Sequence, residues 1–273
     1  MKKNSAYTLL RYPGGKFYAL KFLEPFLKSV EHDEYREPFF GGGSVFWAKE
    51  KVKFNWINDL EPNLINLLNV IKDKDKRDAL LSFFENEKEA TKENYNIVKQ
   101  FLPTNDIELA YKYYYLNRTS FSGKMRNPSW GYRPKRSIPP IRWKEKIIPC
   151  GEKLSNVKIT NVDYEELLFA PPVGKNVLMF LDPPYYHAKQ ESHYICSFSE
   201  KEHIRLSNNL KKTPFKFILT YDDCEEIRNM YKWANIYEQQ FFYRLDNSRN
   251  NNNKRKKGCE LIITNFEVTN GKK

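Results

Sequence analysis

A short apolar run that stops at an Asp-Pro-Pro sequence constrains the fold of this chain most strongly. Asn176 to Leu181 reads NVLMFL, and Asp182, Pro183 and Pro184 follow it directly. A continuous apolar run of this length, without polar alternation, is typical of a strand buried in a parallel sheet. The run therefore predicts an α/β fold, and the patterns of the neighbouring segments can be compared with that expectation.

Segments with strand and helix patterns alternate towards both ends of the chain. Strand patterns, rich in β-branched and aromatic residues, occur at Tyr35–Pro38, Val52–Asn58, Phe215–Tyr221, Ile236–Tyr243 and Glu260–Phe266. Helix patterns occur at Asn63–Lys72, Ser199–Lys212 and Asp222–Trp233. The second helix opens with Ser199 followed three residues later by Glu202, the spacing of a capping box. This alternation predicts a sheet with helices on both faces.

The middle of the chain breaks the alternation. Lys74–Gln100 has a helical, charge-laced pattern, and Ile107–Arg118 is rich in tyrosine. Thr119–Trp143 fits neither a helix nor a strand, but its basic residues and prolines are interleaved with Phe121, Trp130, Tyr132 and Trp143. A long irregular segment in a compact protein is usually functional or disordered, and these aromatic residues favour an ordered, functional segment. We therefore predict an inserted, mainly helical domain at 73–149, between catalytic segments 1–72 and 150–273.

The charge of the chain favours a polyanionic partner. Its 46 Lys and Arg residues outnumber 34 Asp and Glu residues, which gives a formal charge of +12. Basic side chains that replace phosphate counterions gain free energy from the release of those ions. A lysine-rich soluble protein would have the same composition, so charge alone leaves both interpretations open. A basic, asparagine-rich segment at Asn247–Gly258 is typical of a mobile surface loop.

Several functional classes are disfavoured by residue spacing. No run approaches 18 apolar residues, and the first residues lack the apolar region of a secretory signal, so we expect a cytoplasmic protein. The four cysteines have no C-x-x-C spacing and are expected to be reduced thiols. His187, His193 and His203 lie within 17 residues, but no ligand pattern joins them. We expect solvated histidines and no metal site.

Three local patterns indicate chemistry when they are taken together. Phe39 to Ser44 reads FFGGGS at a predicted strand-to-helix turn, where glycines allow a ligand to approach the backbone closely. Asp59 ends the next predicted strand, where a carboxylate can accept hydrogen bonds from both ribose hydroxyls. Asp182 to Tyr185 reads DPPY, and its carboxylate, a carbonyl before proline and the tyrosine ring suit an amino-bearing nucleobase extruded from a helix. A nucleoside cofactor and a nucleic-acid substrate are therefore expected at one sheet edge.

These patterns, in this order, resemble the Dam-type DNA adenine-N6 methyltransferases, the α-group enzymes that use S-adenosylmethionine. The resemblance spans nearly the whole chain and rests on the motifs Tyr12–Lys16, Glu37–Phe46, Ile57–Asp59, Leu116–Asn127, Asn161–Asp163, Asp182–Tyr185 and Glu260–Asn265. It implies a Rossmann-like methyltransferase sheet with an inserted target-recognition domain. Tyr12 stands where the family commonly has Trp, and Ser122 stands where it commonly has Asn. The pattern typical of GATC-specific members is missing between Pro128 and Pro140, so no recognition sequence is predicted.

The resemblance also implies roles for individual residues. The catalytic motif is Asp182, Pro183, Pro184 and Tyr185. The residues expected at the cofactor are Tyr12, Lys16, Phe39, Phe40, Gly41, Gly43, Asp59, Asp163 and Asp182, with Lys16 near the cofactor's carboxylate or at the mouth of the site. The residues expected at DNA are Asn117, Arg118, Phe121, Ser122, Arg126, Asn127, Arg133, Lys254 and Arg255.

The resulting hypothesis is a direct transfer of the methyl group from S-adenosylmethionine to adenine N6 in double-stranded DNA, with no metal. The partners implied are duplex DNA and a restriction endonuclease of the same specificity, in a bacterium or a phage-infected host, and the enzyme would be a monomer or weak dimer. Cytosine N4 and RNA adenine are alternative targets because both offer an exocyclic amine. A catalytically silent DNA-binding or anti-restriction protein is a further alternative.

Overall fold

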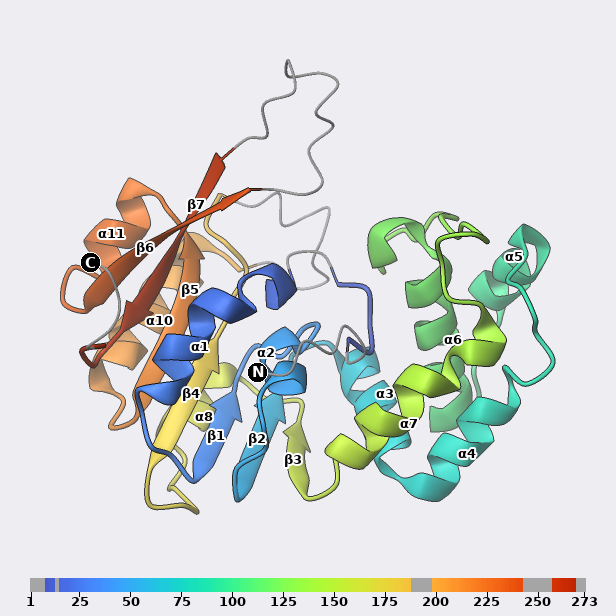
Figure 1. The fold of residues 1–273 in the computed structure, drawn as a ribbon, viewed down its shortest axis with the longest axis horizontal. Coiled ribbons are helices and arrows are strands. Elements are labelled where there is room, and N and C mark those ends of the chain that lie inside the picture. The colour runs from blue at the N-terminus through green and yellow to red at the C-terminus, as the bar shows by residue number, and fades with distance from the viewer. Residues whose placement is uncertain (1–7, 13–14, 188–197, 243–256, 269–273) are drawn as a thin grey trace.

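The computed structural model describes residues 8–12, 15–187, 198–242 and 257–268 of the chain (Figure 1). A seven-stranded sheet with the order β3-β2-β1-β4-β5-β7-β6 organises these residues. The strands are β1 (Glu34–Glu37), β2 (Phe54–Asn58), β3 (Val157–Thr160), β4 (Val177–Leu181), β5 (Lys216–Asp222), β6 (Asn235–Phe242) and β7 (Lys257–Thr264). The first five pair in parallel, whereas β7 is antiparallel to both β5 and β6.

The two faces of the sheet are buried in different clusters. In β4, Leu178 and Phe180 belong to one apolar cluster, whereas Met179 and Leu181 belong to the other. This separation follows from the period of two along a strand. Helix α1 (Leu20–Lys28) packs into the first cluster, and α8 (Tyr164–Phe169) and α10 (Glu200–Lys212) pack into the second. The predicted α/β fold with helices on both faces is confirmed.

The strand order places a topological switch between β1 and β4. The chain runs outward from β1 to β2 and β3 and then returns to β4 on the other side of β1. In open α/β sheets, ligands bind outside the carboxyl ends of the strands at such a point. The glycine-rich turn follows β1 and the DPPY motif follows β4, so both predicted functional segments lie at this switch.

The inserted segment is mainly helical, as predicted, and packs beside α3 (Pro62–Lys72) (Figure 1). Its helices are α4 (Lys74–Ser82), α5 (Lys92–Gln100), α6 (Asp106–Thr119) and α7 (Lys144–Lys153), with 3-10 turns at Phe121–Gly123 and Pro140–Arg142. Leu67 of α3 and Trp143 of the insert are fully buried in the same apolar cluster. The insert therefore shares its core with the sheet domain, and α7 continues through the predicted domain boundary at residue 150.

Several predicted element boundaries differ from the observed ones. The helix predicted at Asp222–Trp233 is the shorter α11 (Glu225–Met230), because Asp222 still pairs within β5. The strand predicted to end at Phe266 ends at Thr264, because the Asn265 side chain instead bonds the backbone on either side of Lys216. Of the predicted loop at 247–258, residues 247–256 lie outside the described residues and 257–258 belong to β7.

The remaining short elements are the 3-10 turn η1 (Lys16–Tyr18) and α2 (Ser44–Ala48), which follows the glycine turn. The described helices include none with the length and apolar character needed to cross a membrane. His203 was expected to be solvated, and that expectation is wrong. Its ring is 1% exposed inside α10, and its Nδ1 lies 2.6 Å from the Tyr221 hydroxyl.

Candidate active site and DNA interface

The turn after β1 requires its glycines. Gly41 and Gly43 have φ angles of 47° and 63°, in the left-handed region that disfavours side chains. A Cβ atom on Gly43 would lie 2.3 Å from the Phe40 ring, and one on Gly42 would lie 2.7 Å from Cβ of Tyr12. The turn is thus packed between two aromatic side chains, and its backbone faces the cavity described below.

Asp59 joins this turn to the end of β2. Its Oδ2 accepts a hydrogen bond of 2.7 Å from the backbone N–H of Gly41, and its Oδ1 accepts one of 2.9 Å from Glu61. Burial raises the pKa of the Asp59 carboxyl, and these backbone donors oppose the rise. The predicted pairing of glycine turn and strand-end carboxylate is therefore present as direct contact.

The Asp182 side chain is held by two groups at the carboxyl end of β4. The Lys16 ammonium lies 2.8 Å from its Oδ1, and the Thr220 hydroxyl donates to the same oxygen at 2.7 Å. Lys16 is 3% exposed and lies 4.5 Å above the ring of Tyr185. Lys16, which was predicted near the cofactor, thus contacts the catalytic motif directly. A base can stack on Tyr185 only on the opposite face of the ring or after Lys16 moves.

Asp222 fixes the backbone that follows the DPPY motif. This residue ends β5, the neighbour of β4, and its two carboxylate oxygens accept the N–H groups of Tyr186 and His187 at 3.0 and 3.1 Å. Sequence reasoning had assigned no role to Asp222 or to Thr220. The only available signal was their position around the end of the strand predicted at Phe215–Tyr221, because Thr220 lies just inside it and Asp222 just after it.

Two buried glutamates near the motif were also missed as functional groups. Glu37 is 2% exposed, accepts a hydrogen bond of 2.6 Å from Tyr35, and has its pKa raised to about 8, mainly by burial. Glu260 accepts a hydrogen bond of 2.5 Å from Tyr18, and burial raises its pKa too. Both carboxyls sit close enough to Asp182 to interact with it electrostatically. Glu37 and Glu260 each begin a motif that supports the family resemblance, and this position was the sequence signal that could have identified them.

A single cavity brings most of the predicted cofactor residues together. Its lining includes Tyr12, Lys16, Phe39, Phe40, Gly41, Gly43, Asp59, Asp182 and Pro184. Glu37 and Tyr164 also line it, and the insert contributes Tyr113, Gly123 and Met125. The cavity therefore lies between the carboxyl edge of the sheet and the inserted segment.

Asp163 does not line this cavity, although it was predicted to lie near the cofactor. Its carboxylate caps α8 by accepting the N–H of Glu165 and forms an ion pair of 2.7 Å with Arg205. The next residue, Tyr164, lines the cavity instead, and its ring lies 5.2 Å from that of Phe39. The cavity therefore has planar apolar surface from Phe39 and Tyr164, and it lacks the carboxylate of Asp163 that was predicted there.

Asn117 was predicted to contact DNA, but its side chain is 1% exposed and fully used inside the protein. Its Oδ1 accepts the N–H of Arg11 at 2.9 Å, and its Nδ2 donates to the carbonyls of Arg11 and Gly123 at 2.9 and 3.1 Å. A Cβ on Gly123 would lie 2.1 Å from the Arg11 carbonyl. We name this set of contacts between Arg11, Asn117 and Gly123 the latch. It ties Gly123 to Arg11, the residue before Tyr12. Gly123 lies in residues 118–142, which were predicted to recognise DNA and which we name the recognition segment.

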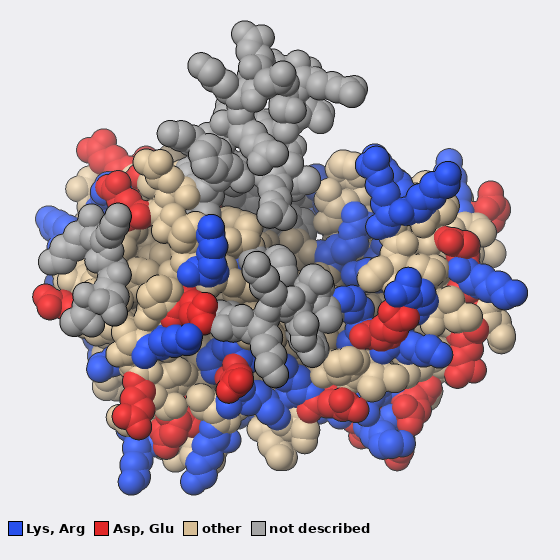
Figure 2. All heavy atoms as spheres, viewed as in Figure 1, with Lys and Arg blue, Asp and Glu red and all other residues tan. Residues whose placement is uncertain are grey.

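The other predicted DNA residues lie beyond the latch, and most are exposed. Phe121 is 54% exposed, and Arg126, Asn127 and Arg133 are exposed, whereas Arg118 and Ser122 are half-buried. Arg118 to Arg142 holds seven Lys and Arg residues and no Asp or Glu. Figure 2 shows Lys and Arg side chains gathered on the part of the insert that faces the middle of the view. Lys254 and Arg255 lie outside the described residues.

Comparison with known proteins agrees with this arrangement. Residues 12–245 match the family model of the D12 class of N6 adenine-specific DNA methyltransferases. The chain belongs to this family. Its membership favours adenine in DNA over the alternatives of cytosine N4, RNA adenine and a silent DNA-binding protein.

Individual relatives are similar along most of their length. The chain is 28% identical to the type II methyltransferase M.CviBI of Paramecium bursaria Chlorella virus NC1A, over 88% of this chain and 93% of that protein. It is 27% identical to the type II methyltransferase M1.LlaDCHI of Lactococcus lactis subsp. cremoris, over 94% of both chains. It is also 27% identical to a DNA adenine methylase of Haemophilus influenzae, over 68% of this chain and 66% of that one.

The family implies the use of S-adenosylmethionine, and the lining of the cavity fits that molecule. A nucleoside needs hydrogen-bond acceptors for its ribose hydroxyls and planar surface for its base, which Asp59 and the rings of Phe39 and Tyr164 offer. The ammonium and sulfonium groups of S-adenosylmethionine are cationic, and Asp182 supplies a carboxyl group in the same cavity.

Proposed function

We propose that this enzyme transfers a methyl group from S-adenosylmethionine directly to N6 of an adenine extruded from double-stranded DNA. The observation that carries the proposal is the cavity shared by Asp59, the glycine turn and Asp182. A cofactor held by Asp59 and the glycine turn would have its methyl group near Asp182. Positioning of this kind supplies much of the acceleration when the reacting atoms are held in line.

Asp59 would hold the ribose of the cofactor. Each carboxylate oxygen has about two lone pairs, and a backbone N–H occupies one site on each oxygen. The backbone N–H of Leu60 also interacts with the carboxylate, and the lone pairs that these donors leave would accept the ribose hydroxyls. The same backbone bonds fix the orientation of the carboxylate before the ligand arrives, which lowers the entropy lost on binding.

Asp182 and the carbonyl of Pro183 would bind the amine of the target adenine. Lys16 and Thr220 both contact Oδ1 of Asp182, so Oδ2 can accept one N6 hydrogen while the carbonyl accepts the other. Both hydrogen bonds favour a pyramidal nitrogen, whose lone pair is withdrawn from the ring and directed at the methyl group. When bound, S-adenosylmethionine supplies that methyl group on a positively charged sulfur.

Lys16 would set the electrostatics of this centre. Its ammonium lies 2.8 Å from Oδ1 of Asp182, so a positive charge holds this oxygen while Oδ2 is left to accept the hydrogen bond from N6. The pairing with Thr220 fixes the carboxylate in one orientation. After transfer, the nitrogen loses one proton, and Asp182 is the nearest base that the motif provides.

DNA would be held by the exposed side of the recognition segment. Its basic side chains would contact phosphates, which gives strong salt dependence, and an Arg with bidentate geometry can read guanine. Arg126 and Arg133 are our candidates for these contacts, and the exposed ring of Phe121 is our candidate wedge beside the extruded base. Asn117 would act indirectly. Through the latch it would hold this segment against Arg11, which precedes the cavity residue Tyr12.

The relatives suggest the biological partner. Two of them are named type II methyltransferases, so we propose that this enzyme protects DNA from a restriction endonuclease of the same specificity. We retain the prediction of a monomer or weak dimer.

Fluorescence of a substituted duplex tests base extrusion. The target site is first found by sequencing methylated DNA from cells that express the enzyme. A duplex carrying 2-aminopurine in place of the target adenine should then fluoresce more strongly on binding, because the base leaves the stack. A duplex with 2-aminopurine two positions away is the matched control. An equal response from both duplexes would contradict extrusion of the target base.

A further inference from the structure

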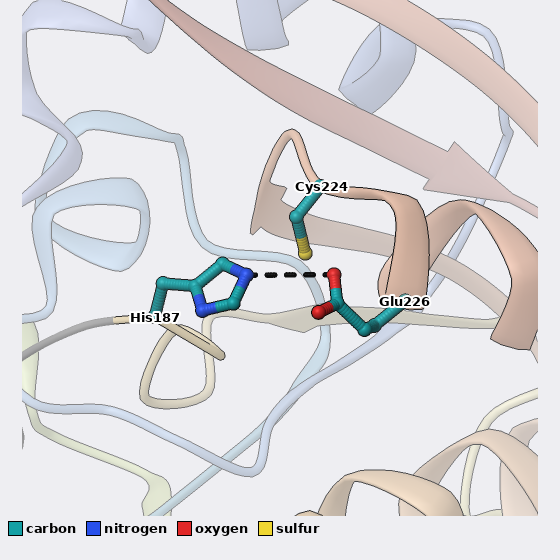
Figure 3. A group of neighbouring side chains, drawn as sticks. All are labelled: His187, Cys224 and Glu226. Atoms are coloured by element: carbon teal, nitrogen blue, oxygen red, sulfur yellow. Dashed lines mark ion pairs between the residues drawn. The ribbon is translucent and has the colours of Figure 1, made fainter.

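A group of three potential metal ligands lies beside the catalytic motif and has no part in the proposed reaction. It consists of His187, Cys224 and Glu226, whose ligand atoms all lie within 4.8 Å of one another. His187 lies five residues after Asp182, and the other two residues lie at the start of α11, after β5. Figure 3 shows the imidazole and the carboxylate pointing toward each other, with the thiol beside them.

We propose that these three side chains bind one divalent transition-metal ion of the Zn²⁺ type. Imidazole nitrogen, thiolate sulfur and carboxylate oxygen are the donors that Zn²⁺ takes in proteins. One thiolate and one carboxylate would together balance its two positive charges. Three protein ligands leave a fourth position for water, since tetrahedral coordination is preferred.

The distance between the histidine and the glutamate suits a tetrahedral ion, and the thiol lies within 4.8 Å of both. Bonds of about 2.0–2.3 Å from the metal place pairs of ligand atoms roughly 3.3–3.6 Å apart. Nε2 of His187 lies 3.4 Å from Oε2 of Glu226, which is already one edge of such a tetrahedron (Figure 3). An ion pair between these two side chains would give the same separation. The Cys224 thiol also forms a hydrogen bond with the Glu226 carboxylate, so the arrangement offers a third donor atom, and the titration below separates an ion pair from a metal site.

The surroundings also favour a positive ion. The backbone N–H of His187 donates to Oδ2 of Asp222, which fixes the position of the histidine and adds a nearby negative charge. The neighbouring cation, Arg228, is engaged with Asp223 and Glu238. The group is half-buried to exposed, so an ion can reach it from solvent.

The site would connect two strand-end loops. His187 belongs to the turn after the DPPY motif, whereas Cys224 precedes α11 and Glu226 lies in its first turn. A bound ion would therefore fasten the backbone after Tyr185 to α11, in addition to the bonds from Asp222. Such a link would raise thermal stability in proportion to the logarithm of ion concentration above Kd.

Titration with Co²⁺, an optical substitute for Zn²⁺, tests the site on the full chain without DNA or cofactor. We expect one equivalent of Co²⁺ to give the thiolate charge-transfer band and the strong visible bands of a tetrahedral site, and Zn²⁺ to displace it, following the Irving–Williams order. C224S should remove the charge-transfer band. H187A and E226Q should each weaken binding on the order of 10–100-fold.

C259S is the matched control, because Cys259 is also half-buried and outside the group. It should leave the spectrum unchanged, and unaltered circular dichroism of each metal-free variant should show that it folds. No charge-transfer band with the wild-type chain, or an equal band with C224S, would overturn the proposal. Neither result would bear on methyl transfer, because the assay contains neither of its substrates.

Discussion

The cofactor edge of the sheet and the recognition segment use charge in opposite ways. At the cofactor edge, Asp59, Lys16 and Asp182 each have named partners and little freedom to move. In the recognition segment, Arg126 and Arg133 are exposed, while the backbone beneath them is fixed by the latch. In our proposal, the methyl transfer therefore depends on buried polar contacts, whereas target recognition depends on exposed side chains that would contact DNA.

The insert contains the same contrast at smaller scale. Residues 74–100 hold six Lys and Arg residues and six Asp and Glu residues, whereas 118–142 hold seven basic residues and no acidic one. Both stretches belong to one helical unit, so composition alone does not separate them. The excess of seven positive charges in 118–142 lies in the part of the insert that faces DNA in our proposal. It accounts for over half of the net charge of +12.

The largest expected effect is that of Asp182→Asn. The substitution keeps the shape of the side chain but removes the charge paired with Lys16, so the rate of methyl transfer should fall on the order of 10²–10³-fold. Filter binding should show DNA affinity within about twofold of wild type. Asp78→Asn, at an exposed ion pair on α4, is the control. Transfer within tenfold of the wild-type rate would contradict the assigned role.

Glu37→Gln tests burial at the cofactor edge through pH. Burial raises the folded-state pKa of Glu37 to about 8, above its ordinary value of 4.5. Protonated Glu37 therefore makes a contribution to the free energy of unfolding that is fully present below pH 4.5. This contribution is lost as the pH rises to about 8. Gln lacks this dependence, so the variant should equal wild type near pH 4.5 and exceed it at pH 8, by at most a few kcal/mol.

Urea denaturation at pH 5, 6, 7 and 8 measures this difference. Wild type should lose stability relative to Glu37→Gln at each step. Glu145→Gln, at an exposed pair with Arg142, should run parallel to wild type. Parallel curves for wild type and Glu37→Gln would show that Glu37 has an ordinary pKa.

Asp59→Asn tests the ribose contact. Asn can accept at only one of the two positions, so a charge-assisted hydrogen bond worth about 1.5–3 kcal/mol is lost, and the Kd for S-adenosylmethionine should rise roughly 10–150-fold. Calorimetric titration measures this directly. Asp73→Asn, which keeps a capping residue at the start of α4, should leave the Kd unchanged. An unchanged Kd in Asp59→Asn would remove Asp59 from the cofactor site.

Asn117→Ala tests the latch between the two regions. It leaves the backbone groups of Arg11 and Gly123 buried without partners, so the free energy of unfolding should fall by about 1–3 kcal/mol. Methylation of non-target sites should also rise relative to the target, because the recognition segment is no longer held in register. Asn69→Ala, on the exposed face of α3, is the stability control. Full stability with unchanged selectivity would show that the latch is dispensable.

The smallest effect is expected from single exposed arginines. Arg126→Ala and Arg133→Ala should each weaken DNA binding by about 1–3 kcal/mol if the residue reads a base, with relaxed selectivity at one position. A phosphate contact would instead weaken binding to all sequences and lower the salt slope by about one. Lys74→Ala, in the charge-balanced stretch 74–100, should change neither quantity. If both arginine variants behave like Lys74→Ala, the recognition segment is not the DNA surface.

Much of the fold and the cofactor edge could be predicted because the signals are local. The apolar run before Asp182 identified β4, and the glycine turn and Asp59 met because parallel strands end at one edge. The contacts that could not be predicted join distant segments. Asn117 bonds Arg11 across 106 residues, and Asp163 bonds Arg205 across 42. The neighbouring sequence does not specify such distant partners. Asn117 was therefore expected to contact DNA and Asp163 to contact the cofactor, whereas both form bonds within the protein.

Mass spectrometry of the methylated base tests the central claim most directly. The enzyme is incubated with methyl-labelled S-adenosylmethionine and duplex DNA of mixed sequence, and the DNA is then digested to nucleosides. If the methyl group is transferred to adenine N6, the label should appear in N6-methyladenine with the wild-type enzyme and should be nearly absent with Asp182→Asn. Label in N4-methylcytosine, or no labelled base on any duplex, would contradict it.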